Sequence, residues 1–183
     1  MKILVLASAS VLAFATPAMA QSYKAASFIE QIGNANTSTV NQNSNNQISS
    51  IQQLSSNDTA LNNLNGTRNT SVVVQQASQS VSGYNKSENR MDGNRDQNFV
   101  TQSGMGNVSY TTFGTESANS TSMVSQNGAR NLVDYTSTGA NNESMVMQVF
   151  DGNTATVVQK ASNGLSAISQ NGTGNIATVT QAR

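Results

Sequence analysis

The chain has 183 residues, with nine basic and nine acidic side chains and neither histidine nor cysteine. The missing residue types exclude cysteine nucleophiles, Ser-His-Asp triads, disulfides and zinc sites built from histidine or cysteine. A formal net charge of zero gives no electrostatic reason to expect nucleic acid as a partner. The acidic residues are scattered along the chain, so we expect no enzymatic activity, no cofactor and no metal site.

The first twenty residues have the pattern of a secretory signal peptide. Lys2 supplies the positive start, residues 3–15 form an apolar run, and residues 18–20 read Ala-Met-Ala, a small-x-small cleavage site. A transmembrane helix needs about 20 apolar residues, and this run is shorter and ends before Pro17. We predict cleavage after residue 20, a short segment over 21–26, and no membrane span.

A motif of Ser-x-(Val/Ile)-x-Gln recurs along the rest of the chain, mostly at a spacing of 22 residues. A spacing of two places its three residues on one face of a β-strand. Its glutamines are Gln31, Gln53, Gln75, Gln102, Gln126, Gln148 and Gln170. Its β-branched residues are Ile29, Ile51, Val73, Val100, Val124, Val146 and Ile168.

A looser strand pattern lies about eleven residues after each of these motifs. It carries glutamine near the two ends of the chain, at Gln42, Gln159 and Gln181. Its middle copies have Leu64, Met91, Phe113 and Ser137 at the same position.

Glycine and asparagine separate the two kinds of strand. Both residue types tolerate a positive φ and form tight turns at little steric cost. The predicted turn residues are Gly33, Asn36, Gly66, Asn69, Gly104, Asn107, Gly128, Asn131, Gly139, Asn142, Gly172 and Asn175.

These patterns predict an all-β fold, a two-sheeted β-solenoid of about seven strand-turn-strand coils with about 22 residues each. It would cover residues 27–181, followed by a tail of residues 182–183. Stacked coils place glutamine over glutamine, so buried amides bond to their own copies, while the aliphatic columns form a dry contact between the sheets. A disordered polar linker and a globular β-sandwich explain the fixed period less well.

One irregularity interrupts the period. Gln75 and Met91 are 16 residues apart instead of 11, which predicts an irregular charged insert over about 76–97. We interpret it as a solvated bulge; the alternative is a charged segment that slows self-assembly. Its charged residues are Lys86, Glu88, Arg90, Asp92, Arg95 and Asp96.

The repeat resembles that of the curlins, which runs Gln-x-Gly-x-x-Asn-x-Ala/Ser-x-x-x-Gln. The copies that begin at Gln31 and Gln170 fit it fully, and those at Gln102, Gln126 and Gln148 fit in part. The resemblance implies an amyloid-core ladder of the glutamine and aliphatic columns above. It also implies end-to-end polymerisation into curli fibres and export through an outer-membrane pore. Curlins carry a longer segment before the repeats than residues 21–26 offer.

We therefore expect a subunit of extracellular curli-like amyloid fibres at the cell surface, secreted through the periplasm, with roles in biofilm and adhesion. Its expected partners are copies of itself, other curlin subunits and the outer-membrane export machinery. Three alternatives stay open: a minor subunit that nucleates another curlin, a monomeric solenoid adhesin, and a β-helical polysaccharide lyase.

Overall fold

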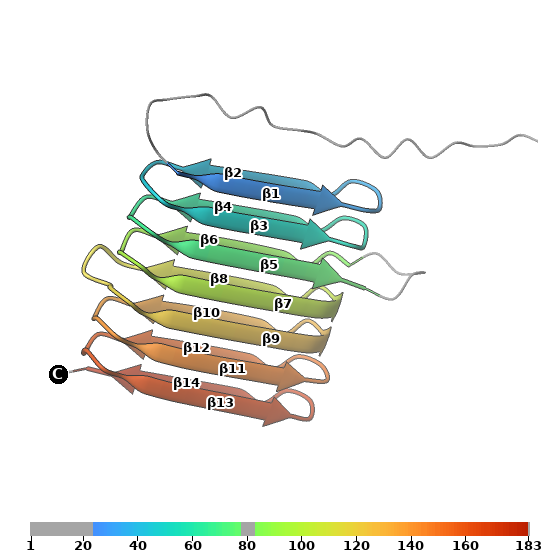
Figure 1. Ribbon diagram of the computed structural model, residues 1–183. Coiled ribbons are helices and arrows are strands. Elements are labelled where there is room, and N and C mark those ends of the chain that lie inside the picture. Colours follow the sequence, from blue (N-terminus) through green and yellow to red (C-terminus); the bar gives the residue numbers. More distant parts are fainter. Residues whose placement is uncertain (1–23, 78–82, 183) are drawn as a thin grey trace, which may run out of the picture.

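The structure is a computed structural model that describes residues 24–77 and 83–182 as β-strands joined by short arcs (Figure 1). The predicted signal peptide over 1–20 lies outside the described residues. The strands are β1 (Ala26–Gln31), β2 (Thr37–Gln42), β3 (Ile48–Gln53), β4 (Thr59–Leu64), β5 (Thr70–Gln76), β6 (Lys86–Met91), β7 (Gln97–Met105), β8 (Val108–Phe113), β9 (Thr121–Ala129), β10 (Leu132–Ser137), β11 (Glu143–Val149), β12 (Thr154–Gln159), β13 (Leu165–Asn171) and β14 (Ile176–Gln181).

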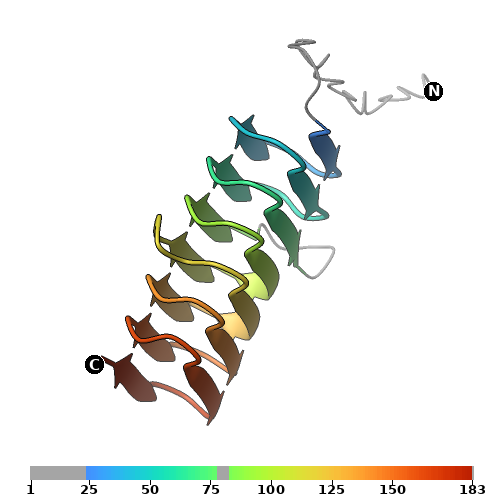
Figure 2. The ribbon, with the colours of Figure 1, turned by 60° about the vertical axis from the view of Figure 1, so that its left-hand side comes forward.

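The strands form two seven-stranded parallel sheets. Sheet A has the order β1-β3-β5-β7-β9-β11-β13, and sheet B has the order β14-β12-β10-β8-β6-β4-β2. Each coil therefore contributes one strand to each sheet, and the two sheets form facing stacks joined by arcs (Figure 2). This arrangement confirms the predicted two-sheeted β-solenoid of about seven coils.

Strand register follows the repeat. β1 pairs with β3 so that Ser27, Ile29 and Gln31 lie beside Ser49, Ile51 and Gln53. The same three columns continue through all the remaining strand pairs of sheet A. Register is strongly specified here because a slip of one residue would turn the apolar side chains outward.

The core is a narrow layer between the sheets. From β3 to β13 the strands alternate buried and more exposed positions, as expected for side chains that point to opposite faces. The buried apolar residues form one cluster along the axis. In the end coils Ile29, Val40, Ala177 and Val179 are only partly buried, because each of these coils has a neighbour on one side only.

The charged insert is narrower than predicted, and the prediction is wrong for most of 76–97. Residues 86–91 form β6, which pairs in register with β4 and β8. Ser87, Asn89 and Met91 point inward, while the charged side chains alternate with them on the outer face. The extra residues instead fall between β5 and β6, where residues 78–82 lie outside the described part.

Candidate functional site: the amide columns and the end coils

A column of glutamines runs inside sheet A across all seven coils. Each side-chain Nε2 donates to Oε1 of the glutamine in the following coil, as the repeat predicted. The donor-to-acceptor distances are 2.7 Å for Gln31 to Gln53, 2.9 Å for Gln53 to Gln75, 2.8 Å for Gln75 to Gln102, 2.9 Å for Gln102 to Gln126, 3.0 Å for Gln126 to Gln148 and 2.8 Å for Gln148 to Gln170.

The second N–H of these amides is also used. Gln53 donates to the Thr37 carbonyl at 3.1 Å, and Gln102 donates to the Lys86 carbonyl at 2.9 Å, both at the start of the facing strand. Gln75, Gln126, Gln148 and Gln170 repeat this contact. The buried amides are therefore satisfied, which avoids a cost of about 1–3 kcal/mol for each unpaired group.

The equivalent column in sheet B is amide only near its ends. Gln159 donates to Oε1 of Gln181 at 3.0 Å, whereas Leu64, Met91 and Phe113 fill the middle as fully buried apolar side chains. The Tyr135 hydroxyl donates to Oε1 of Gln159 at 3.0 Å and takes the place of the missing glutamine donor. Sequence reasoning missed this bond, which joins neighbouring columns.

The aliphatic column of sheet A faces the same interior. The predicted residues from Ile51 to Ile168 are buried, and Ile29 is half-buried in the first coil. Val133, Val157 and Ala155 of sheet B are fully buried members of the same apolar cluster. In the middle coils the layer between the sheets also buries polar side chains of sheet B, at Asn62, Asn89 and Thr111.

A second polar column follows the arcs that lead from sheet A to sheet B. A backbone N–H of each coil donates to the side-chain oxygen of the previous coil. Asp58 N–H donates to Asn36 at 3.0 Å, and Asn175 N–H donates to Asn153 at 3.0 Å. The intermediate bonds, at 2.9 to 3.1 Å, run through Asn85, Asn107 and Asn131. Asn36, Asn107, Asn131 and Asn175 are predicted turn residues, whereas Asp58, Asn85 and Asn153 were not among them; the column itself was not predicted.

The predicted turn glycines are needed for close stacking as well as for positive φ. At Gly128, with a φ of 125°, an added Cβ would overlap the carbonyl of Phe150 in the next coil. At Gly66 φ is not positive, yet a Cβ would overlap the carbonyl of Gly93. Adjacent arcs therefore approach too closely for a side chain at these positions.

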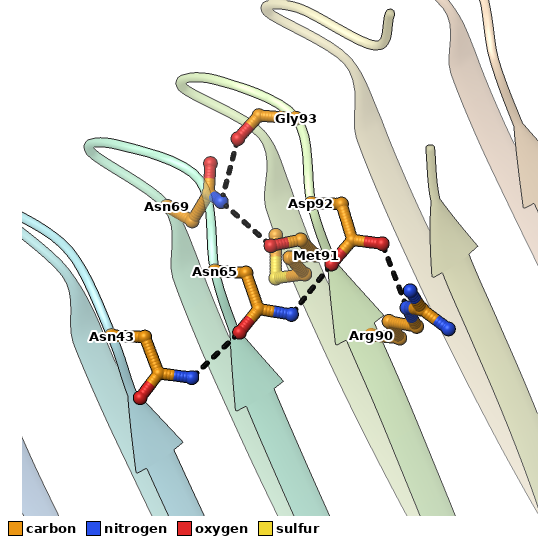
Figure 3. A network of polar contacts seen from close by, with 7 residues as sticks. All are labelled: Asn43, Asn65, Asn69, Arg90, Met91, Asp92 and Gly93. Carbon is orange, nitrogen blue, oxygen red and sulfur yellow. Dashed lines mark hydrogen bonds and ion pairs between the residues drawn. The ribbon is translucent and has the colours of Figure 1, made fainter. Parts of the chain in front are cut away.

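A short exposed ladder lies on the outside of the arcs after β2, β4 and β6 (Figure 3). Asn43 donates to Asn65 at 2.7 Å, and Asn65 donates to Asp92 at 2.6 Å. Arg90 Nε donates to the other carboxylate oxygen of Asp92 at 2.7 Å. Because an ionised carboxylate only accepts hydrogen bonds, Asp92 ends the run of donated amides.

The two ends of the solenoid carry complementary groups. In the glutamine column the ends are Oε1 of Gln31 and an Nε2 N–H of Gln170. In the arc column the ends are the N–H of Asn36 and the side-chain oxygen of Asn175. One end thus offers an acceptor where the other offers a donor, and this holds in both columns.

These features define a two-sheeted parallel β-solenoid with in-register amide columns. No protein-family model, curated protein or solved structure matches the chain. The resemblance to the curlin repeat therefore remains a prediction from the sequence. Among residues 24–77 and 83–182, no three His, Cys, Asp or Glu side chains are grouped so that they could hold a metal ion, and no helix is long and apolar enough to cross a membrane.

Proposed function

We propose that the chain is a structural subunit of an extracellular curli-like amyloid fibre that grows by stacking coils end to end. The observation that carries this proposal is the complementarity of the two ends. When the last coil of one copy meets the first coil of the next, the Gln170 amide faces Oε1 of Gln31. The Asn36 N–H faces the side-chain oxygen of Asn175. Both columns then continue across the junction with unchanged direction.

The sheet edges at the two ends support the same proposal. β1 and β13 are the outermost strands of sheet A, and β2 and β14 are those of sheet B. An exposed strand edge is a template for pairing with another chain unless charge, proline or a covering element blocks it. The inward side chains of these edges, at positions 27, 29 and 31 in β1 and at positions 177, 179 and 181 in β14, include neither charge nor proline. A second copy of this chain therefore fits each edge.

The junction also explains where sheet B keeps its glutamines. Gln159, Gln181 and the Gln42 of a following copy would form a three-residue amide column centred on the junction. The middle of the same column is apolar within each subunit. Amide pairing in sheet B is thus concentrated where it would select a second copy in register.

A charge placed at the end of the glutamine column tests this proposal. Gln170→Glu keeps the acceptor for Gln148 but removes the outward donor, so we expect a longer lag in a dye-binding assay. Acidification below the ordinary glutamate pKa of about 4.3 restores a donor and shortens the lag. Ser169→Glu is the matched control, because Ser169 points outward from the same strand and is exposed.

Fibre diffraction of the purified chain provides the direct test. A fibre made of stacked coils gives a meridional spacing of about 4.8 Å and a sheet spacing near 10 Å. A chain that stays monomeric in size-exclusion chromatography, or equal lags for the two Glu variants, would contradict end-to-end growth. A persistent monomer would favour the alternative of a solenoid adhesin.

Secretion through the periplasm, export by an outer-membrane machinery of the curli type and a role in biofilm and adhesion complete the proposal. Other curlin subunits would be additional partners. A minor, nucleating role predicts that the chain seeds another curlin at substoichiometric amounts.

A further inference from the structure

The arcs from sheet B to sheet A contain a column of side chains that donate hydrogen bonds to the next coil. Asn69 donates to the carbonyls of Met91 at 3.2 Å and Gly93 at 2.9 Å (Figure 3). Gln47 donates to the corresponding carbonyls one coil earlier, and Ser120 Oγ donates to the Gly139 carbonyl at 3.3 Å. Each of these side chains bonds to the arc of the following coil.

Asp96 occupies this column, and an ionised carboxylate has no proton to donate. The residue is fully buried. Its Oδ1 accepts hydrogen bonds from the Ser120 N–H at 2.9 Å and from Ser117 Oγ at 3.2 Å. Its Oδ2 has no hydrogen-bond partner. Oδ2 and the Ser117 carbonyl oxygen both border the small space beside Gly93, where a side chain would overlap them.

Asp58 shows how the solenoid satisfies a buried carboxylate elsewhere. Asp58 is also fully buried, and its Oδ1 accepts the Asn85 N–H at 2.9 Å. Its Oδ2 accepts a short hydrogen bond from Ser55, three residues earlier in the same arc. The residue three positions before Asp96 is Gly93, which has no side chain to donate a hydrogen bond. Both aspartates accept two hydrogen bonds, but the two at Asp96 fall on Oδ1 and leave Oδ2 without a partner.

No basic group neutralises Asp96 in the described part of the chain. The ion pairs there are Lys86–Glu88 and Arg90–Asp92. Arg68, Arg95 and Glu116, the other charged side chains of the three arcs stacked at this point, are exposed.

The titratable group that faces Asp96 from β10 is Tyr135, whose hydroxyl is engaged with Gln159. Burial raises the pKa of Asp96 to about 6, against the opposing effect of the hydrogen bonds from Ser120 and Ser117.

We propose that Asp96 is a pH sensor within the solenoid: its neutral carboxyl donates the hydrogen bond that asparagine donates elsewhere in the column, and ionisation removes that bond. The acceptor is the carbonyl of Ser117, the counterpart of the Gly93 carbonyl that Asn69 contacts. In the ionised form, a buried charge faces a carbonyl oxygen. This inference concerns the stability of a single subunit and does not rest on fibre formation.

The direction of the effect follows from the pKa values. The unfolded chain loses the Asp96 proton near pH 3.8, whereas the folded chain holds it until about pH 6. The folded state binds more protons in this interval, so the contribution of Asp96 to stability is fully present below about pH 3.8, falls as the pH rises through the interval, and is lost above about pH 6. The difference between the two pKa values corresponds to a roughly hundredfold change in the unfolding equilibrium constant across this pH range.

The test is urea unfolding of the full chain between pH 4 and pH 8, with circular dichroism as the measure of the folded fraction. Asp96→Asn should remove most of the pH-dependent loss and equal or exceed the wild type in stability at pH 7.5. Asp58→Asn is the matched control, because Asp58 is equally buried but has a partner on each oxygen; the proposal requires a larger change in pH dependence for Asp96→Asn than for this variant. Carboxyl ¹³C NMR measures the Asp96 pKa directly and does not depend on how well any variant folds.

Two results would overturn the proposal. One is an Asp96 that titrates near the ordinary aspartate value, together with an unchanged pH dependence in Asp96→Asn. The other is a gain in stability at pH 7.5 on adding CaCl₂ that EDTA reverses and Asp96→Asn abolishes. That outcome would assign the unpartnered oxygen to a bound cation instead of a proton.

Discussion

Tyr135 connects the apolar middle of the buried column in sheet B with the glutamines at its C-terminal end. Its ring contacts Phe113 edge-to-face, with centroids 5.4 Å apart and an interplanar angle of 66°. Its hydroxyl donates to Gln159, and burial raises the pKa of Tyr135 to about 12, so the donor proton is retained at physiological pH. The small side chain of Ser137 occupies the glutamine position of the same strand.

Tyr135→Phe tests this bond. The variant keeps the ring packing but leaves Oε1 of Gln159 without its tyrosine donor, so we expect a loss of about 1–2 kcal/mol in the free energy of unfolding. Urea unfolding measures the loss. Tyr110→Phe is the control, because Tyr110 lies on the outer face of β8 and should change stability little. Equal losses in both variants would contradict a specific role for the Tyr135 hydroxyl.

Within a strand, a single glutamine matters because the residues above and below depend on it. Gln102 accepts from Gln75 at 2.8 Å, donates to Gln126 at 2.9 Å and donates to the Lys86 carbonyl at 2.9 Å. Sheet B shows that a run of apolar residues can replace the amides when neighbours change together. An isolated replacement instead leaves buried polar groups on both sides without partners.

We therefore expect Gln102→Leu to destabilise the solenoid by about 3 kcal/mol, since each buried group left unsatisfied costs about 1–3 kcal/mol. Gln97→Leu is the matched control, because Gln97 lies on the same strand and is exposed. Thermal or urea unfolding of the two variants gives the comparison. A similar stability for both would show that the amide column contributes little to the fold.

The whole molecule behaves as a one-dimensional stack in which each coil contacts only its neighbours. Gly128 in an inner coil could not carry a side chain, because the carbonyl of Phe150 lies against it. The equivalent residue of the last coil is Gly172, with a φ of 122°, and the nearest atom to an added Cβ there is Asn175 Nδ2 at 3.3 Å. A clash with a neighbouring coil would thus arise at Gly172 only when another copy stacks on this end, whereas the backbone strain of a side chain at a φ of 122° is present in the isolated subunit as well.

Gly172→Ala should consequently slow assembly by more than its backbone strain in the isolated subunit explains. Gly174→Ala is the control for a substitution in the same arc, because no atom lies within 4 Å of its added Cβ and its φ of 73° is closer to the left-handed region that alanine can adopt. Dye-binding kinetics measures assembly, and circular dichroism verifies the fold of both variants. Unchanged lag in a well-folded Gly172→Ala variant would argue against stacking on the last coil.

Residue spacing was sufficient to predict the coils, their two strands and the inward columns. In-register parallel stacking brings identical residues together, so the repeat in the sequence indicates which residues lie beside one another in the sheet. Gln75, Gln102 and Gln126 fall into one column although their spacing is uneven. The same logic located the turns that contain Gly128 and Asn131.

Contacts between columns depended on the three-dimensional arrangement. The bond from Tyr135 to Gln159, the unpartnered oxygen of Asp96 and the close approach at Gly66 involve residues with different positions in the repeat. The placement of the charged residues on β6 depended on the register in which β6 pairs with β4. Periodicity specifies which residues lie above one another, whereas side-chain size and facing distance specify which residues meet across the layer.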